Sequence, residues 1–257
     1  MTTTIELQEL DILKGSVPPP SPETEQTVEG AHAVVLLSGG QDSATCLAWA
    51  CKVYGKENVS AIGFEYGQRH AKELQFARRL ADLAGVTHQV FGMDVLRRVT
   101  AGASALTDES VEIKETDGLP TSFVPGRNIL LLSLAASWAY SQGHRTIHLV
   151  TGVSQEDYSG YPDCRQETTS SLQQTLNHGL DCDVRIEAPL QFRTKAQTVK
   201  LMSQLGHLDW YAWTLTCYEG QDPPCGTCLS CELRAKGFRE AGIPDPLLER
   251  HGESLSG

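Results

Sequence analysis

AVVLLSGGQDSATCLAWAC, residues 33–51, joins an apolar run to an apolar helix face through two adjacent glycines. The run at 33–37 predicts a buried strand, and apolar side chains recur at helical spacing from 44 to 51. Glycine lets a ligand approach the main chain, and a helix start presents unpaired N–H groups with partial positive charge. We therefore predict that the turn between them binds phosphate.

A tight turn between a strand and a helix is the plainer interpretation of the pair Gly39-Gly40. The same turn also holds two serines, Ser38 and Ser43, together with Asp42, and this composition favours phosphate. A Walker loop is excluded, because no Gly-Lys-Ser or Gly-Lys-Thr closes the stretch.

The remaining apolar runs predict four further strands that alternate with helices, at 59–64, 86–95, 146–153 and 184–190. This alternation predicts an α/β fold with a doubly wound, mostly parallel five-stranded sheet. Ligands of such sheets gather beyond the carboxyl ends of the strands. We expect the backbone from Phe64 to Tyr66 to hold adenine, with ordinary packing of Tyr66 as an equal alternative.

Two basic side chains stand where helices are expected to begin. Arg127 follows a long polar connection and precedes Asn128, which we expect to cap an apolar helix reaching residue 141. Lys195 lies in the first turn of a helix that opens with the capping-box pattern Thr194-Lys195-Ala196-Gln197. A cation there opposes the helix dipole, which indicates an anion partner nearby. Solvent-exposed side chains are the alternative at both positions.

The end of the fourth predicted strand runs into a segment rich in carboxylates, aromatics and glycine, at residues 154–165. A flat heterocycle could stack on a tyrosine there while an acid accepts from its N–H groups. A polar surface loop is the alternative. The candidate residues for this substrate contact are Tyr158, Gly160, Tyr161, Asp163 and Arg165.

Composition and charge indicate which partners, domains and cellular location to expect. The chain has 257 residues and a formal net charge of −11, which argues against a nucleic-acid partner. Residues 1–30 are acidic and proline-rich and predict a disordered tail, leaving 31–206 as the main domain and 207–257 as a small C-terminal segment. No run approaches the ~20 apolar residues of a membrane span, and no signal sequence is evident. We expect a cytoplasmic protein without a membrane partner.

Four cysteines near the C-terminus follow the spacing C-x7-C-x2-C-x2-C: Cys217, Cys225, Cys228 and Cys231. Four thiolates this close can bind one tetrahedral zinc ion. Disulfides are disfavoured in the cytoplasm, and an iron–sulfur cluster of the ferredoxin type would need a further Cys-Pro. We predict one structural zinc, because four protein ligands leave no coordination position open.

Ser38-Gly39-Gly40-Gln41-Asp42-Ser43 is similar to the SGGxDS signature of the PP-loop ATP pyrophosphatases. Three blocks together resemble one PP-loop family, the 7-cyano-7-deazaguanine synthases of queuosine biosynthesis. They are 38–47, the pair 123–128 and 156–165, and 215–217 with the cysteines that follow. The resemblance covers about residues 32–245. The first thirty residues and Gln191-Phe192-Arg193 depart from the family pattern.

The resemblance implies a carbon–nitrogen ligase that converts 7-carboxy-7-deazaguanine, ammonia and ATP to 7-cyano-7-deazaguanine (preQ0). Adenylated acid and amide intermediates release AMP and diphosphate. It implies that Leu37 and the signature residues bind ATP, that Asp42 helps to place Mg²⁺, and that Arg127 and Lys195 act on phosphate charge. No covalent nucleophile is required, so Cys164 receives no such role. The sequence leaves a homodimer open.

Two other functions compete with this interpretation. A tRNA-modifying PP-loop enzyme would need a basic surface, whereas residues 31–257 still carry a net charge of −6, with 26 acidic and 20 basic side chains. A zinc-stabilised binding module with a degenerate nucleotide site is disfavoured by the intact glycine loop.

Overall fold

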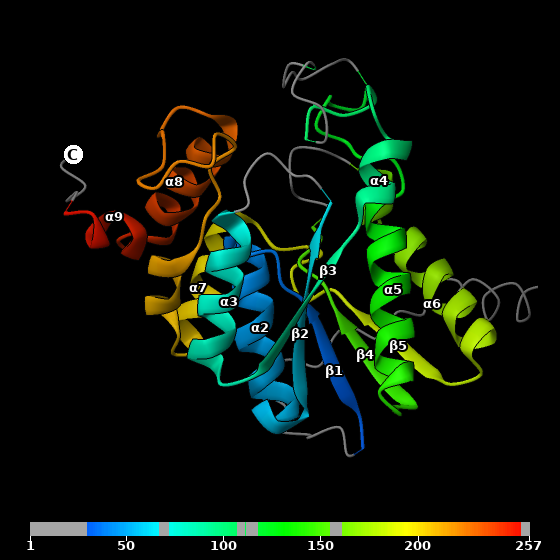
Figure 1. Ribbon diagram of the computed structural model, residues 1–257. Coiled ribbons are helices and arrows are strands. Elements are labelled where there is room, and N and C mark those ends of the chain that lie inside the picture. The colour runs from blue at the N-terminus through cyan, green and yellow to red at the C-terminus, as the bar shows by residue number, and fades with distance from the viewer. Residues whose placement is uncertain (1–29, 67–71, 107–110, 112–117, 155–160, 253–257) are drawn as a thin grey trace, which may run out of the picture.

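The computed structural model describes residues 30–66, 72–106, 111, 118–154 and 161–252. Within these residues, five parallel strands form one sheet in the order β3-β2-β1-β4-β5 (Figure 1). The strands are β1 (His32–Leu36), β2 (Val59–Glu65), β3 (Thr87–Gly92), β4 (Thr146–Val150) and β5 (Asp183–Glu187). The predicted α/β class with a five-stranded parallel sheet is confirmed.

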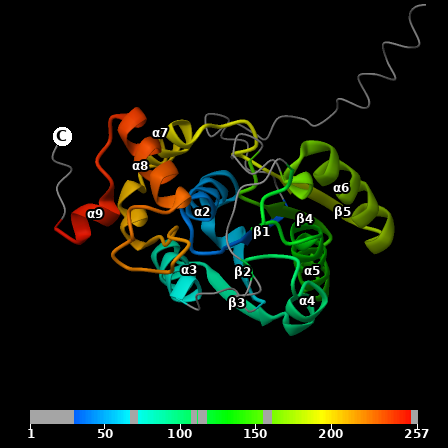
Figure 2. The same cartoon turned by 90° about the horizontal axis from the view of Figure 1, so that it is seen from above.

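Helices cover both faces of the sheet (Figures 1 and 2). One face carries α2 (Gln41–Tyr54), α3 (Lys72–Ala84) and α7 (Lys195–Gln204), with α8 (Leu229–Ala241) packed on α7. The other face carries α5 (Arg127–Ser141) and α6 (Gln166–Leu180). Shorter helical segments are α4 (Asp94–Val99), α9 (Pro246–Arg250), η1 (Lys56–Asn58), η2 (Pro162–Cys164) and η3 (Leu208–Trp213).

Strand β1 is buried on both faces, because alternate side chains enter two different cores. Val35 packs in the core that includes Trp49 of α2, whereas Val34 packs in the core that includes Leu132 of α5. All four of these side chains are at most 1% exposed. The carboxyl end of β1 is thereby fixed between two helical layers, and the glycine loop follows it directly.

The third predicted strand, 86–95, extends too far. Strand β3 ends at Gly92, and Asp94 begins α4. This helix occupies residues that we predicted partly as the end of the third strand and partly as the polar connection after it. Asp94 in the first turn and two arginines in the last turn suit the helix dipole, a signal that the apolar pattern concealed.

The helix after the glycine loop begins earlier than its apolar pattern suggested. Gly40 is the N-cap of α2, so Gln41, Asp42 and Ser43 form the first helical turn. The predicted tail lies outside the described residues, apart from Gly30. Among the described residues, no helix has the length and apolar character needed to cross a bilayer.

Candidate functional site

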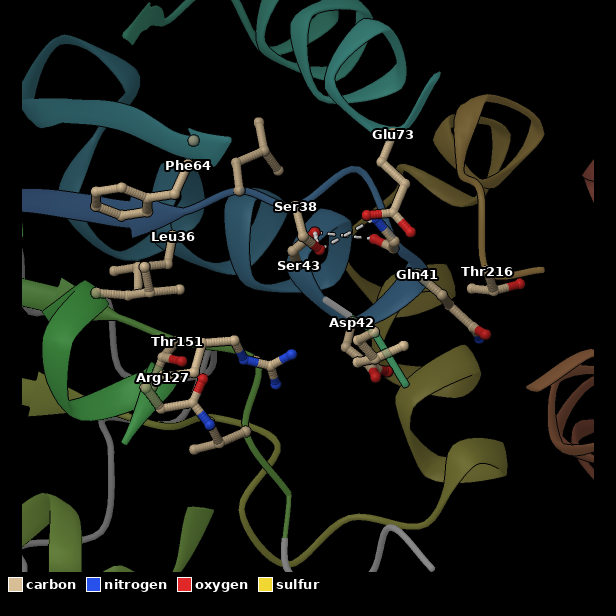
Figure 3. A pocket seen from close by; sticks show the side chains of 18 of the residues that line it. Leu36, Ser38, Gln41, Asp42, Ser43, Phe64, Glu73, Arg127, Thr151 and Thr216 are labelled. Carbon is tan, nitrogen blue, oxygen red and sulfur yellow. Dashed lines mark hydrogen bonds between the residues drawn. The ribbon is translucent and has the colours of Figure 1, made fainter. Parts of the chain in front are cut away.

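A cavity of about 360 Å³ opens beyond the carboxyl ends of β1, β2 and β4 (Figure 3). The glycine loop lies at its base, and side chains from both faces of the sheet surround it. Its lining includes Leu37, Ser38, Gly40, Gln41, Asp42, Ser43, Phe64, Tyr66, Glu73, Arg127, Thr151, Gly152, Tyr161, Leu215, Thr216 and Tyr218. The sequence-predicted nucleotide residues therefore share one cavity, except Gly39, which is not part of its lining.

The glycine loop is held by hydrogen bonds within itself. The Ser38 hydroxyl donates to the Ser43 hydroxyl at 3.1 Å and accepts from the Gly40 backbone N–H at 3.3 Å. The Ser43 hydroxyl donates in turn to the Gly40 carbonyl at 3.0 Å. The start of α2 directly follows, so its partial positive charge lies beside these hydroxyls. This arrangement can bind a phosphate group.

Two glycines allow neighbouring elements to approach this loop closely. Gly39 has φ +90°, and a Cβ on it would lie 2.3 Å from the Glu73 backbone carbonyl oxygen of α3. A Cβ on Gly152, after β4, would lie 3.2 Å from Asp42. Glycine is therefore required at residue 39 both by its left-handed backbone and by the contact with α3.

Asp42 and Lys195 form an ion pair beside the loop. Lys195 Nζ donates to Asp42 Oδ2 at 2.7 Å, while Asp42 Oδ1 is buried and has no hydrogen-bond partner among the described residues. The expected capping box is present, with Thr194 and Gln197 bonded reciprocally. The anion partner expected for Lys195 is thus a carboxylate of the protein. Lys195 contributes to the site through Asp42 and is not part of the cavity lining.

The unpartnered oxygen of Asp42 suits a divalent cation. Mg²⁺ in phosphate-binding sites takes one or two carboxylate oxygens and completes its shell with phosphate and water. Asp42 Oδ1 lies at the phosphate loop and offers one such ligand. The donor set therefore fits magnesium brought in with a nucleotide.

Arg127 is the first residue of α5 and lines the cavity from the face opposite α2. Burial by itself lowers the pKa of Arg127, but Tyr66, Asp163 and Tyr161 act in the other direction and raise it overall. The guanidinium is therefore a fixed positive charge in the cavity.

The expected capping of α5 by the Asn128 side chain is wrong. The N-cap residue is Gly126, with φ +71° and no side-chain cap, and the Asn128 backbone N–H donates to Asp163 Oδ2 at 3.0 Å. A carboxylate from η2, distant in sequence, serves this helix start. Asp163 is only 5% exposed and does not line the cavity.

The predicted substrate segment is only partly described. Tyr158 and Gly160 lie outside the described residues. Tyr161 lines the cavity, and its hydroxyl bonds to the Ser122 hydroxyl at 2.7 Å. Arg165 is exposed and does not line the cavity. Of the described members of this set, Tyr161 alone faces the cavity.

Several lining residues were not found from the sequence, including Glu73, Thr151, Thr216 and Tyr218. Glu73 stands in the first turn of α3, where an acid is ordinary on dipole grounds, so its sequence position gives no functional signal. Burial raises its pKa to about 7, although Arg127 acts to lower it. Thr216 is adjacent to the predicted zinc ligand Cys217, and no sequence pattern assigns its own side chain to the nucleotide site.

The four predicted zinc ligands lie together. The sulfurs of Cys217, Cys225, Cys228 and Cys231 all lie within 4.8 Å of one another. Backbone N–H groups of Thr227 and Cys228 lower the pKa of Cys225 to about 6, so that this thiol ionises readily. Four converging sulfurs, two of them buried, fit a tetrahedral metal with thiolate ligands.

The cysteine cluster is attached directly to the glycine loop. The Leu215 backbone N–H donates to the Gly39 carbonyl at 2.9 Å, and Leu215 packs with Cys217 and Cys231. Leu215, Thr216 and Tyr218 also line the cavity. The cluster therefore supports one wall of the candidate site.

Comparisons with a family model and with known proteins point to the same family. The family model described as queuosine biosynthesis protein QueC matches residues 32–242. A 7-cyano-7-deazaguanine synthase from Chromobacterium violaceum is 53% identical over 222 residues, covering 85% of this chain and 93% of the relative. Enzymes of the same name from Laribacter hongkongensis and Staphylococcus saprophyticus are 49% and 43% identical, covering 85% and 84% of this chain and 95% of each relative.

Proposed function

The chain belongs to the queuosine biosynthesis QueC family, and from this we propose that it converts 7-carboxy-7-deazaguanine, ammonia and ATP to 7-cyano-7-deazaguanine. It is an ATP-dependent ligase that forms a carbon–nitrogen bond. The observation that carries the assignment to this cavity is Asp42, which has one oxygen bound to Lys195 and one oxygen at the phosphate loop with no partner among the described residues.

The reaction needs two adenylations at the same substituent. The substrate carboxylate attacks the α-phosphorus of ATP and displaces diphosphate, and ammonia then displaces AMP from the acyl carbon and loses a proton to give the amide. The amide oxygen attacks a second ATP and again displaces diphosphate. Loss of the remaining amide protons and departure of AMP leave the nitrile. One site suffices, because both steps place AMP on an oxygen of one group.

The cavity residues supply position and charge for these steps. We assign diphosphate to the loop from Ser38 to Ser43 and adenine to the end of β2, at Phe64 and Tyr66. Arg127 contributes fixed positive charge on the opposite side. Asp42 would hold Mg²⁺, which supplies charge neutralisation for the phosphates when bound, and Lys195 holds Asp42 in place.

The heterocycle is proposed to lie near the segment that holds Tyr158, Gly160, Tyr161, Asp163 and Arg165. Tyr161 is the member supported by position, since its ring lines the cavity and lies 5.5 Å from the ring of Phe123. The bond from Asn128 to Asp163 supports an indirect role for this carboxylate, in which it positions the start of α5 and Arg127.

We also propose a structural zinc on the four clustered cysteines and a reducing, cytoplasmic location, where such thiols persist. The acidic net charge supports small-molecule substrates without a nucleic-acid partner. A homodimer is compatible with these proposals.

The proposed substrate can be tested by acceptor-dependent AMP release. The protein is incubated with ATP, Mg²⁺ and ammonium, and either 7-carboxy-7-deazaguanine or unmodified tRNA is added. AMP is expected only with the deazaguanine. AMP release with tRNA alone would contradict the proposal and indicate a tRNA-modifying enzyme.

A further inference from the structure

Glu73 is an acid placed at the edge of an anion site. It stands in the first turn of α3 and lines the cavity together with the phosphate loop. Figure 3 shows its side chain reaching from α3 toward Ser38. Its backbone approaches the loop closely, because the Glu73 carbonyl oxygen lies 2.3 Å from where a Cβ on Gly39 would be.

The surroundings of Glu73 favour its neutral form. Burial raises its pKa from an ordinary 4.5 to about 7, and the charge of Arg127 only partly opposes this shift. Among the described residues, no hydrogen bond or ion pair of the Glu73 carboxyl is found. In the described part of the chain, the other titratable side chains that line the cavity are Asp42 of α2, Arg127 of α5, Tyr66 after β2, Tyr161 and Cys164 around η2, and Tyr218 near the cysteine cluster.

A bound polyphosphate would favour the neutral form of the Glu73 carboxyl group further. Its negative charge would enter the loop beside Glu73, and a nearby like charge disfavours the carboxylate form. A neutral carboxylic acid has an O–H group that can donate to a phosphate oxygen, whereas a carboxylate can only repel it. Glu73 therefore suits phosphate when it carries a proton.

We propose that Glu73 is a phosphate-binding residue that acts as a neutral carboxylic acid and takes up one proton from solvent when ATP or diphosphate binds. The proton returns to solvent when the anion leaves, so each binding event is balanced. The proposal rests on the proposed function only in requiring that the loop bind diphosphate.

Calorimetric titration of diphosphate and of ATP, each without added divalent metal, tests this directly. Measurements in buffers of different ionisation enthalpy give the number of protons taken up. With a free-state pKa of about 7, wild type should take up about half a proton more than Glu73→Gln at pH 7, since the glutamine mimics the neutral acid.

The pH dependence of diphosphate affinity tests the proposed protonation of Glu73 independently. At pH 6, wild type and Glu73→Gln should bind diphosphate almost equally. At pH 8, Glu73→Gln should bind about tenfold more tightly, because only about a tenth of wild-type Glu73 is then neutral before binding. Glu73→Ala, which has no donor, should lose the proton uptake and bind about tenfold more weakly than wild type at pH 6.

Glu57→Gln is the matched control, because Glu57 is exposed on η1, which precedes the amino end of β2, whereas the cavity opens beyond the carboxyl ends of the strands. It should match wild type in both measurements. Equal proton uptake by wild type and Glu73→Gln would overturn the proposal. So would proton release assigned to Glu73 when Mg²⁺ is added, since a metal ligand must be deprotonated. A wild-type protein that binds no diphosphate at all would overturn the proposed function as well.

Discussion

Asp42 uses its two carboxylate oxygens differently. Lys195 holds Oδ2 at 2.7 Å, and Oδ1 is buried at the phosphate loop without a partner in the described part of the chain. The sequence predicted both residues at the site, from the signature loop and from a cation in a helix first turn. It could not predict that they bond to each other, because 153 positions separate them in the chain.

Asp42→Asn should reduce AMP formation by about 10²-fold or more while the protein stays folded, because the change removes the charge that the proposed Mg²⁺ requires. Steady-state AMP release and circular dichroism check both parts. Asp82→Asn, at an exposed position of α3, should behave as wild type. Wild-type turnover in Asp42→Asn would remove this residue from the mechanism.

Glu73 should also make stability depend on pH. Its folded-state pKa of about 7 lies above the ordinary 4.5, so the folded protein binds more protons than the unfolded chain between these values. The free energy of unfolding should therefore fall as pH rises through this window. Denaturant titrations of wild type and Glu73→Gln should show a smaller fall in the variant. Identical pH profiles would mean that Glu73 does not titrate near 7.

At the scale of elements, α3 and the phosphate loop meet at Gly39. Gly39→Ala would place a Cβ 2.3 Å from a backbone oxygen of α3 and impose a left-handed backbone on alanine. We expect AMP formation to fall at least tenfold and stability to fall by about 1–3 kcal/mol. Kinetics and denaturant unfolding measure the two effects.

Gly143→Ala separates these two causes. Gly143 has φ +94°, close to that of Gly39, but no atom of the described residues lies within 4 Å of its Cβ position. This control should lose stability through the backbone alone and keep its activity. Equal losses of activity in both variants would show that the contact between α3 and the loop has no role.

The cysteine cluster should influence the phosphate loop through the Leu215–Gly39 hydrogen bond. Cys228→Ser should lower the melting temperature by roughly 5 °C or more, because a structural metal contributes folding free energy. The variant that remains folded should also bind diphosphate more weakly, since one wall of the cavity loses its support. Thermal unfolding, metal content and calorimetry check these effects.

Cys182→Ser is the control for that experiment, because Cys182 is a free thiol outside the cluster. It should retain about one zinc per chain and normal diphosphate affinity. Iron with acid-labile sulfide in the wild-type protein would contradict the zinc assignment. Normal diphosphate binding by metal-free Cys228→Ser would contradict the structural coupling.

At the scale of the whole molecule, local patterns predicted more of the fold than of the site. Apolar periodicity identified all five strands, and glycine and cysteine spacing located the loop and the cluster. The bonds from Asn128 to Asp163 and from Leu215 to Gly39 join segments 35 or more residues apart, and neither leaves a local pattern. No local sequence pattern indicated Glu73 either, because its raised pKa results from burial in the folded protein.

The number of AMP molecules released for each nitrile formed shows whether the reaction passes through two adenylations. Wild-type protein is supplied with 7-carboxy-7-deazaguanine, ammonium, Mg²⁺ and ATP, and AMP, diphosphate and the deazaguanine products are quantified together by mass spectrometry. Two adenylations at one site predict two AMP and two diphosphate for each 7-cyano-7-deazaguanine, and one of each for any amide that is released. Nitrile formation with a single AMP, or AMP formation without amide or nitrile, would rule out the mechanism with two adenylations.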